Sequence, residues 1–479
     1  MASPTNEMVD FVMRTGFEDL PKEVVHESKL VILDSIGIAL AGIKSEKGRY
    51  GIALAGKLGG LPESSVLGTD IKASCGASAF ANGELMNALD WDAFPLPTHA
   101  PPVVIPPLLA IAENTQASGK DLILGVALGF ELSRRLGMAI RGPKLNFDTA
   151  EGSEPGKITG TKYSVSAIIC PVVAASAGVS RLLKFNREKT SNAVALGGHF
   201  GPFPQAKWKI MSPGTMTKYI CCGWASLAVV VSTQLAELGY TADTTFLDGD
   251  LGYWRFFGSD RWDPEALTGN LGREWRYPPL LEYKLYPCCA FYPVFLECFT
   301  KIIDENKLLP TDIDEIRIQS GPWPSPPPLR GKLKSHIEAQ FHPLYLMACI
   351  VHRIGRADWQ DDDTIHNSDI EKFISRVTFS IEPHPNSQKI RIKEPSANMS
   401  SVEVVAKGKV FKEEGKYIKL ASSFASSHVT AEDLVKKFTG NASKAVSKEK
   451  VTKAIETLLN LEKLGSVSDL IKLVSVENS

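Results

Sequence analysis

Over residues 1 to about 270, apolar positions recur every three or four residues, the spacing of one face of a helix. After Leu20-Pro21, the run from Glu27 to Ala41 is apolar enough to bury most of a helix. The same spacing predicts further helices over 84–89, 106–114, 120–140 and 165–183. The last is rich in Ala, Val and Ser, whose small side chains let helices pack closely. We therefore expect it to be a central buried helix.

The pattern changes near Arg276, where polar and apolar residues begin to alternate. Alternation with period two is typical of strands that are buried on one side. The segments that show it are 311–321, 375–383 and 399–411. A helical pattern over 337–354 lies between them, so this part of the chain is predicted to be an α+β unit.

Residues 431–438 and 448–473 return to the spacing of amphipathic helices. The simplest arrangement is an α+β domain inserted into a helical one, with the C-terminal helices packing back. We therefore predict a mainly α protein. Its large all-α helical domain comprises 1–275 plus 416–479, and its smaller α+β lid domain comprises 276–415.

Composition narrows the class of protein. The 479 residues are 44% hydrophobic and 22% charged, as in a soluble globular protein, and the length favours two domains. A formal net charge of -1 offers no general attraction for nucleic acid or an anionic membrane. The N-terminus lacks a signal-peptide pattern, no apolar run is long enough to span a bilayer, and the terminal SVENS is not a peroxisomal signal. The eight cysteines show no Cys-x-x-Cys spacing, which indicates free thiols in a reducing compartment, so we expect a cytoplasmic protein.

The segment 212–241 is the most informative part of the chain. A Pro-Gly turn leads through Thr215, Thr217 and Lys218 into an almost uninterrupted apolar run, which predicts a helix start. A lysine in the first turn is disfavoured by the helix dipole unless it faces water or an anion. Because the flanking residues are apolar or small, we interpret Lys218 as a candidate anion-binding or proton-transferring group rather than a solvated surface lysine.

A second candidate region is the Pro-rich loop between the helices at 84–89 and 106–114. It carries Asp90, Asp92, Thr98 and His99, and loops held by rigid helices often carry catalytic groups. Two carboxylates and a histidine could bind a metal, but no second histidine stands at ligand spacing nearby, and we predict no metal. A purely structural alternative is that Asp90 caps a helix and His99 hydrogen-bonds locally.

A third region, 281–299, precedes the α+β unit and carries Lys284, Tyr286, Cys288 and Cys289. Cys288 could be a nucleophile, but without a local histidine an ordinary packed thiol is the simpler interpretation. The three regions could converge on a polyanionic small molecule. The chain contains neither a phosphate-binding loop nor a dinucleotide fingerprint.

Together these segments resemble the MmgE/PrpD family, which includes 2-methylcitrate dehydratase, cis-aconitate decarboxylase and iminodisuccinate epimerase. The resemblance runs nearly end to end. The matching segments are LPKEVVHESKLVILDSIGIALAG (20–42), the Asp-aromatic-Asp loop with Thr98-His99, GTMTKYICCGWAS (214–226), KLYPCC (284–289), HIEAQFHPLYLMACIV (336–351) and the C-terminal LLNLEKLGSVSDLIKLV. The resemblance implies a large all-α domain with a smaller α+β lid, a homodimer, a di- or tricarboxylic acid as substrate, and no metal or organic cofactor.

The resemblance also assigns residues. By it, Asp90, His99 and Lys218 are catalytic, and the substrate-binding residues are Asp92, Thr98, Lys284, Tyr286, Thr217 and Cys289. Three positions depart from the family's histidines. Val165, Pro293 and Cys221 stand where it usually has them, and its loop threonine has no clear equivalent here.

Loss of the two histidines replaced by Val165 and Pro293 would make the pocket less polar, and a fully carboxylated substrate would leave charge unpaired there. We therefore hypothesise a substrate more apolar than citrate, such as an alkyl-substituted relative. The favoured reaction is dehydration through an enolate-like carbanion, with Lys218 and Lys284 holding carboxylates. His99 or Asp90 would move the proton, or Asp90 would orient His99. Decarboxylation and epimerisation need the same carbanion and stay open, as does a non-catalytic dimeric carboxylate-binding protein.

Overall fold

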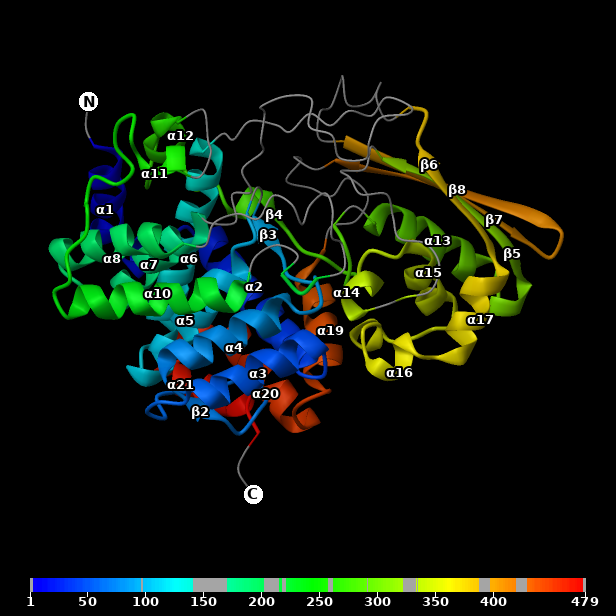
Figure 1. The fold of residues 1–479 in the computed structure, drawn as a ribbon, viewed down its shortest axis with the longest axis horizontal. Coiled ribbons are helices and arrows are strands. Elements are labelled where there is room, and N and C mark those ends of the chain that lie inside the picture. The colour runs from blue at the N-terminus through cyan, green and yellow to red at the C-terminus, as the bar shows by residue number, and fades with distance from the viewer. Residues whose placement is uncertain are drawn as a thin grey trace.

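The computed structural model describes residues 3–95, 98–140, 170–201, 215–217, 221–256, 262–290, 292–321, 333, 335–386, 397–418 and 429–476. Helices dominate these residues and fill one end of the molecule, and a small sheet lies at the other end (Figure 1). The mainly α class predicted from the sequence is confirmed.

The first half of the chain and its last fifty residues supply the helical end (Figure 1). Its helices are α1 (Pro4–Arg14), α2 (Lys22–Gly42), α3 (Glu46–Leu58), α4 (Cys75–Asn87), α5 (Pro101–Asn114), α6 (Gly119–Ala139), α7 (Cys170–Leu182), α8 (Arg187–Phe200), α10 (Cys222–Glu237), α11 (Tyr253–Phe256), α12 (Pro264–Thr268), α19 (Ala431–Ala442), α20 (Lys448–Leu459) and α21 (Val467–Leu473). Two short antiparallel pairs complete it, β1 (Ser64–Ser65) with β2 (Lys72–Ala73) and β3 (Phe94–Pro95) with β4 (Leu281–Glu282).

The central helices are buried because their sequences are apolar or small on nearly every side. From Leu30 to Gly42, every residue of α2 is buried. α6 and α7 pack with their backbones close together, since a Cβ at Gly178 would lie 2.4 Å from the carbonyl oxygen of Gly125. This close packing confirms the expectation for the described part of the 165–183 segment, 170–182.

The other end of the molecule is a four-stranded sheet covered by helices. The strands are β5 (Ile313–Gly321), β6 (Thr378–Pro383), β7 (Ala397–Ala406) and β8 (Lys409–Ile418), in the order β6-β5-β7-β8. β5 is parallel to β6 and antiparallel to β7, and β7 is antiparallel to β8. The helices are α13 (Pro293–Glu305), α14 (His336–Ala339), α15 (Pro343–Val351), α16 (Asp362–Ile365) and α17 (Ser368–Arg376), and α13 packs on β7 and β8.

Three predicted elements are divided in the structure. The single strand expected over 399–411 is a hairpin, whose turn residues Lys407 and Gly408 have φ of 52° and 71°. The helix expected over 337–354 is interrupted before Pro343, because a proline ring cannot continue a preceding helical turn. The helix expected over 448–473 ends at Leu459, and α21 begins only at Val467.

The buried apolar residues form two main clusters. The larger combines residues from Met8 to Tyr283 with others from Leu434 to Val474, and the second runs from Tyr286 to Ala406. The chain therefore passes from one core to the other between Tyr283 and Tyr286. The domain limits expected near 275 and 415 stay a prediction. Among the described helices, none combines the length and apolar character needed to cross a membrane.

Candidate active site

The centre of the candidate site is an ion pair between Asp90 and Lys284. Asp90 follows the end of α4, and its backbone adopts a left-handed conformation with φ of 53°, which aspartate tolerates better than most residues. The pairing of β3 with β4 brings this loop beside the segment that carries Lys284. The Lys284 Nζ lies 2.7 Å from Asp90 Oδ1 and also donates to the Asp90 carbonyl oxygen at 2.9 Å.

Both members of this pair are buried, with side-chain exposures of 2% for Lys284 and 0% for Asp90. Burial lowers the pKa of Lys284, but Asp90 and Asp92 raise it by more, and the net shift is upward. Lys284 is therefore a permanently charged group at neutral pH. Its position between the two hydrophobic cores makes it a link between them.

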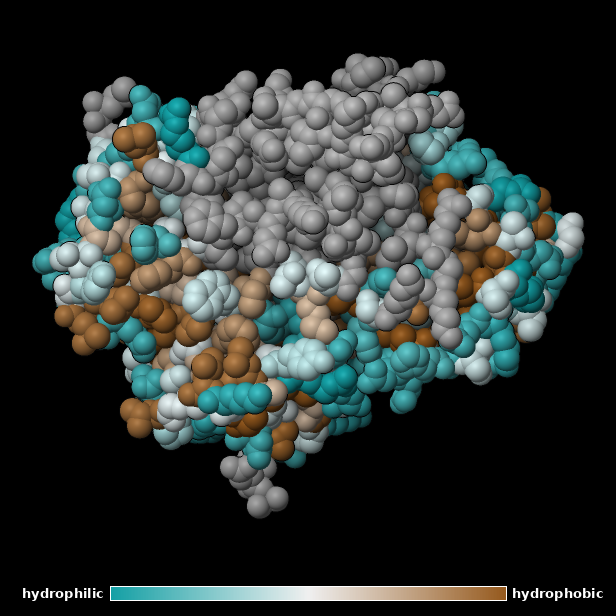
Figure 2. Space-filling model, in the orientation of Figure 1, coloured by the Kyte–Doolittle hydropathy of each residue, from teal (hydrophilic) through white to brown (hydrophobic). Residues whose placement is uncertain are grey.

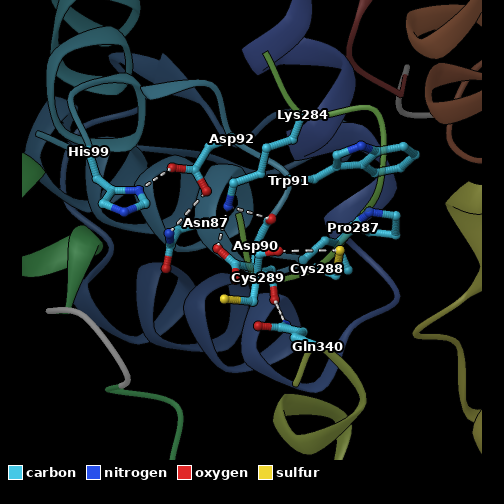
Figure 3. A network of polar contacts seen from close by, with 12 residues as sticks. Asn87, Asp90, Trp91, Asp92, His99, Lys284, Pro287, Cys288, Cys289 and Gln340 are labelled. Carbon is cyan, nitrogen blue, oxygen red and sulfur yellow. Dashed lines mark hydrogen bonds and ion pairs between the residues drawn. The ribbon is translucent and has the colours of Figure 1, made fainter. Parts of the chain in front are cut away.

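Two residues further along, Asp92 contacts His99. The His99 Nδ1 lies 3.0 Å from Asp92 Oδ2, and the Asn87 amide donates to Asp92 Oδ1 at 3.3 Å (Figure 3). The side chain placed to orient His99 is thus Asp92, whereas the sequence had suggested Asp90. Since a carboxylate accepts hydrogen bonds, we assign the proton of the neutral imidazole to Nδ1 and the lone pair to Nε2.

Two glutamines from the sheet end hold the Asp90 turn by its backbone. Gln340 donates to the Ala88 carbonyl oxygen at 2.8 Å and to Gln360 Oε1 at 2.7 Å. Gln360 in turn donates to the carbonyl oxygens of Leu89 at 2.8 Å and Pro287 at 2.9 Å. The turn before Asp90 and the segment after Lys284 are therefore tied to one side chain. The sequence assigned neither glutamine a role, although Gln340 lies within the matching segment 336–351.

A second buried lysine, Lys437 of α19, supports the site from the other side. Its ammonium lies 2.7 Å from Asp34 Oδ1 and donates to the carbonyl oxygens of Trp91 at 3.1 Å and Lys284 at 2.9 Å. Burial lowers the pKa of Lys437, although Asp34 opposes the shift. Burial likewise raises the pKa of Asp34, which Lys437 opposes. Asp34 stands alone in the apolar run LVILDSIGIAL, a signal that could have revealed the pair.

The remaining predicted residues lie around this centre or apart from it. Thr98 is buried, and its hydroxyl is 3.0 Å from that of Ser133. The Cys289 backbone N–H donates to the Gln340 carbonyl at 3.1 Å, and its side chain lies beside Asp90 in Figure 3. Tyr286 packs in the second core, with Arg356 over its ring at 4.1 Å, and Thr217 is exposed.

Lys218, the catalytic residue assigned from the segment 212–241, lies outside the described residues, as does Val165. The apolar helix expected to start near Thr217 instead begins at Cys222, with Cys221 as its N-cap. The capping side chain comes from elsewhere. Glu84 of α4 accepts the Gly223 N–H at 2.6 Å and lies 3.3 Å from the Cys221 Sγ.

The described residues contain no cluster of three or more histidine, cysteine or acidic side chains suited to a metal ion. What the site does contain is an imidazole oriented by a carboxylate, beside a buried ammonium–carboxylate pair. Such an arrangement can move a proton at a carbon next to carboxylates.

The mainly α fold, with a smaller α+β part, is the fold class that the sequence motifs implied. Residues 6–265 match the family model of the MmgE/PrpD N-terminal domain, and residues 286–463 match that of the MmgE/PrpD C-terminal domain. The chain therefore belongs to the MmgE/PrpD family.

Three proteins similar to this chain carry the same name. The human cis-aconitate decarboxylase is 24% identical over 483 residues, which cover 95% of this chain and 91% of that protein. The mouse cis-aconitate decarboxylase is 23% identical over 499 residues, covering 99% and 94%. The cis-aconitate decarboxylase of Aspergillus terreus is 25% identical over 300 residues, covering 60% and 57%.

Proposed function

We propose that this protein is a lyase that acts on a citrate-like polycarboxylate through an enolate-like carbanion. The observation that carries the proposal is the Asp92–His99 contact on the loop whose Asp90 forms a buried ion pair with Lys284. Membership of the MmgE/PrpD family and the names of the relatives support the substrate class.

His99 is the proton-transferring group in this proposal, and Asp92 orients it. The His99 side chain is 18% exposed whereas Asp92 is 1% exposed, so the imidazole is the member of the pair that a substrate can reach. Lys284 is already paired with Asp90, and it adds a fixed positive charge near the developing anion. Lys218 would then hold a substrate carboxylate directly.

Of the possible reactions, decarboxylation of cis-aconitate becomes the first candidate because the relatives carry that name. In it, the bond between carbon and a carboxylate breaks, carbon dioxide leaves, and its electron pair stays on carbon until a proton is delivered. Dehydration, which the sequence placed first, removes the proton and then loses hydroxide from the neighbouring carbon. It is the second candidate, and epimerisation is the third.

Incubation with cis-aconitate and with 2-methylcitrate, followed by NMR and by carbon dioxide release, separates these reactions. We expect carbon dioxide from cis-aconitate, with kcat reduced by about 10²–10⁴ in His99→Gln. Water loss from 2-methylcitrate without carbon dioxide release would select dehydration instead. Binding of both acids without turnover would select the non-catalytic carboxylate-binding protein.

The substrate could also be more apolar than cis-aconitate. The position expected to carry a family histidine in the third region is Pro293, the first residue of α13. Its ring offers no hydrogen bond to a carboxylate. We expect alkyl-substituted acids to give a higher kcat/KM than the unsubstituted ones, and the reverse order would reject this refinement.

The homodimer implied by the family would use α10. Trp224, Val231 and Leu238 are seven residues apart, so they share one helix face, and Tyr240 follows them. All four are exposed, Leu238 by 84%, and apolar surface runs along α10 in Figure 2. Light scattering should detect a dimer of the wild type. The double variant Trp224→Asp with Leu238→Asp should be monomeric. Leu309→Asp, which changes an exposed leucine at the sheet end, should stay dimeric. A monomeric wild type would reject the proposal.

A further inference from the structure

Behind Asp92 lies a run of buried polar side chains to which neither the sequence nor the proposed reaction assigns a role. It starts at Asn87, the last residue of α4, and continues through Lys47 of α3 to Glu84 of α4. All three side chains are at least nine-tenths buried. Polar groups are retained in such surroundings only where they are hydrogen-bonded, so their partners show what the run holds.

The orientation of the Asn87 amide is determined by its two neighbours. Lys47 has only donors, and its Nζ is 2.8 Å from Asn87 Oδ1. The Asn87 Nδ2 therefore points the other way and donates to Asp92 Oδ1 at 3.3 Å. Asp92 Oδ2 is thus left facing His99 Nδ1 at 3.0 Å, so each side chain sets the orientation of the next.

At its other end the run reaches the start of α10. Lys47 Nζ lies 3.3 Å from Glu84 Oε2, and Glu84 Oε1 accepts the Gly223 N–H at 2.6 Å. A carboxylate at a helix N-terminus is favoured by the helix dipole. Burial lowers the pKa of Lys47, but Glu84 together with Cys221 and Cys222 raises it by more, and the net shift is upward. The lysine therefore stays charged between Glu84 and Asn87.

Close packing of α4 and α10 makes this reach possible. A Cβ at position 223 would lie 2.6 Å from the Phe80 carbonyl oxygen and 2.9 Å from the Glu84 Cγ. Only glycine fits there, and its absent side chain lets the Glu84 carboxylate reach the first turn of α10. Of the segment predicted to bind an anion, the described residue Cys221 is the N-cap of this turn.

We propose that Lys47, Glu84 and Asn87 form a positioning relay that holds the Asp92–His99 pair in a fixed geometry relative to the start of α10. They are positioning residues, because they act through Asp92 and through the α10 backbone. The proposal rests on His99 being the proton-transferring group. In this relay, Asn87 prevents the Asp92 carboxylate from rotating, and the Asp92 carboxylate keeps the neutral imidazole protonated on Nδ1.

The test uses the resting protein, so it needs no substrate. Nitrogen-15 NMR of histidine-labelled protein distinguishes the two imidazole tautomers, and His99→Gln identifies the His99 signals among the nine histidines. We expect wild type to hold His99 in the Nδ1–H form and Asn87→Ala to mix in the Nε2–H form. Asn82→Ala is the matched control, because Asn82 is equally buried on α4 but bonds to Ser65 and Leu67 instead.

Lys47→Met tests the relay one step further back, and it also serves if Asn87→Ala does not fold. It keeps the length of the side chain but removes the donor to Asn87. We expect the same mixing of tautomers, and a kcat about a hundredfold lower with KM nearly unchanged. An Nε2–H tautomer in wild type, or an unchanged Nδ1–H tautomer in both variants, would overturn the relay.

These outcomes separate the relay from the proposed function. If wild type converts none of the acids while the tautomers respond as expected, the relay stands and the lyase proposal fails. If wild type is active and the tautomers do not change in the variants, the lyase proposal stands and the relay fails.

Discussion

The ammonium of Lys437 donates a hydrogen bond of 2.9 Å to the backbone carbonyl oxygen of Lys284. The same ammonium binds the Trp91 carbonyl, so one lysine on a C-terminal helix holds both segments that meet in the Asp90–Lys284 ion pair. The site is therefore supported by charges that do not themselves reach the substrate, and their removal should separate stability from activity.

Lys437→Met should lower the free energy of unfolding by about 3–5 kcal/mol, because it leaves Asp34 buried without its cation. Combining it with Asp34→Leu should restore most of this loss, since apolar replacement of a whole buried pair is often neutral. Activity should not return, because the Trp91 and Lys284 carbonyls stay unheld. Denaturant titration measures the stability of each variant, and turnover of cis-aconitate measures its activity. A double variant with normal kcat would contradict the supporting role of Lys437.

Asp90→Asn and Asp90→Ala both remove the carboxylate that pairs with Lys284, but they differ in backbone strain. Asparagine tolerates the left-handed conformation of residue 90, whereas alanine adds roughly 1–2 kcal/mol of strain. We expect both variants to be inactive and Asp90→Ala to be less stable by about that amount. Equal stability of the two variants would show that the backbone relaxes when the ion pair is lost.

The stability difference between wild type and Asp90→Asn should depend on pH. Although burial lowers the pKa of Lys284, its carboxylate neighbours raise it above the unfolded value of about 10.4. A raised lysine pKa adds stability that is complete below the unfolded value and is lost as pH rises through the folded one. The difference in the free energy of unfolding, measured with urea, should be largest near neutral pH and should disappear above about pH 10. A difference that widens in alkali would refute this assignment.

Gln360→Leu should release the carbonyls of Leu89 and Pro287 together. Each buried carbonyl left without a donor costs about 1–3 kcal/mol, so we expect a lower Tm and reduced turnover. Gln319→Leu is the control, because Gln319 lies on β5 and accepts a hydrogen bond from Ser401 at 3.4 Å, within the sheet end. If both variants lose the same turnover, the effect of Gln360 is general destabilisation.

Much of the fold could be predicted because helical and strand periodicities are local. The points at which helices and strands are interrupted were harder to predict. The strand predicted over 399–411 ran through Lys407, Gly408 and Lys409, three consecutive residues without an apolar side chain, and so missed the hairpin turn there. The break before Pro343 was signalled by the proline itself, but the apolar pattern on either side concealed it.

For the site, the sequence identified the loop of Asp90, Asp92 and His99 but not which carboxylate faces the histidine, because that depends on side-chain direction. Lysines on helices are ordinarily solvent-facing, so nothing in the sequence singled out Lys437 or Lys47. Gln360 reaches the carbonyls of Leu89 and Pro287 only because distant segments of the chain pack together, and no local sequence pattern predicts such packing.

The hydrogen bond between Lys437 and the Trp91 carbonyl joins positions 346 residues apart. During synthesis at about 5–20 residues per second, the Asp90 loop would emerge roughly 17–70 seconds before the lysine that supports it. Throughout that interval Asp34 has no cation beside it, and the segments around it cannot settle into their final arrangement. The growing chain could thus complete the support of the Asp90–Lys284 pair only after α19 leaves the ribosome.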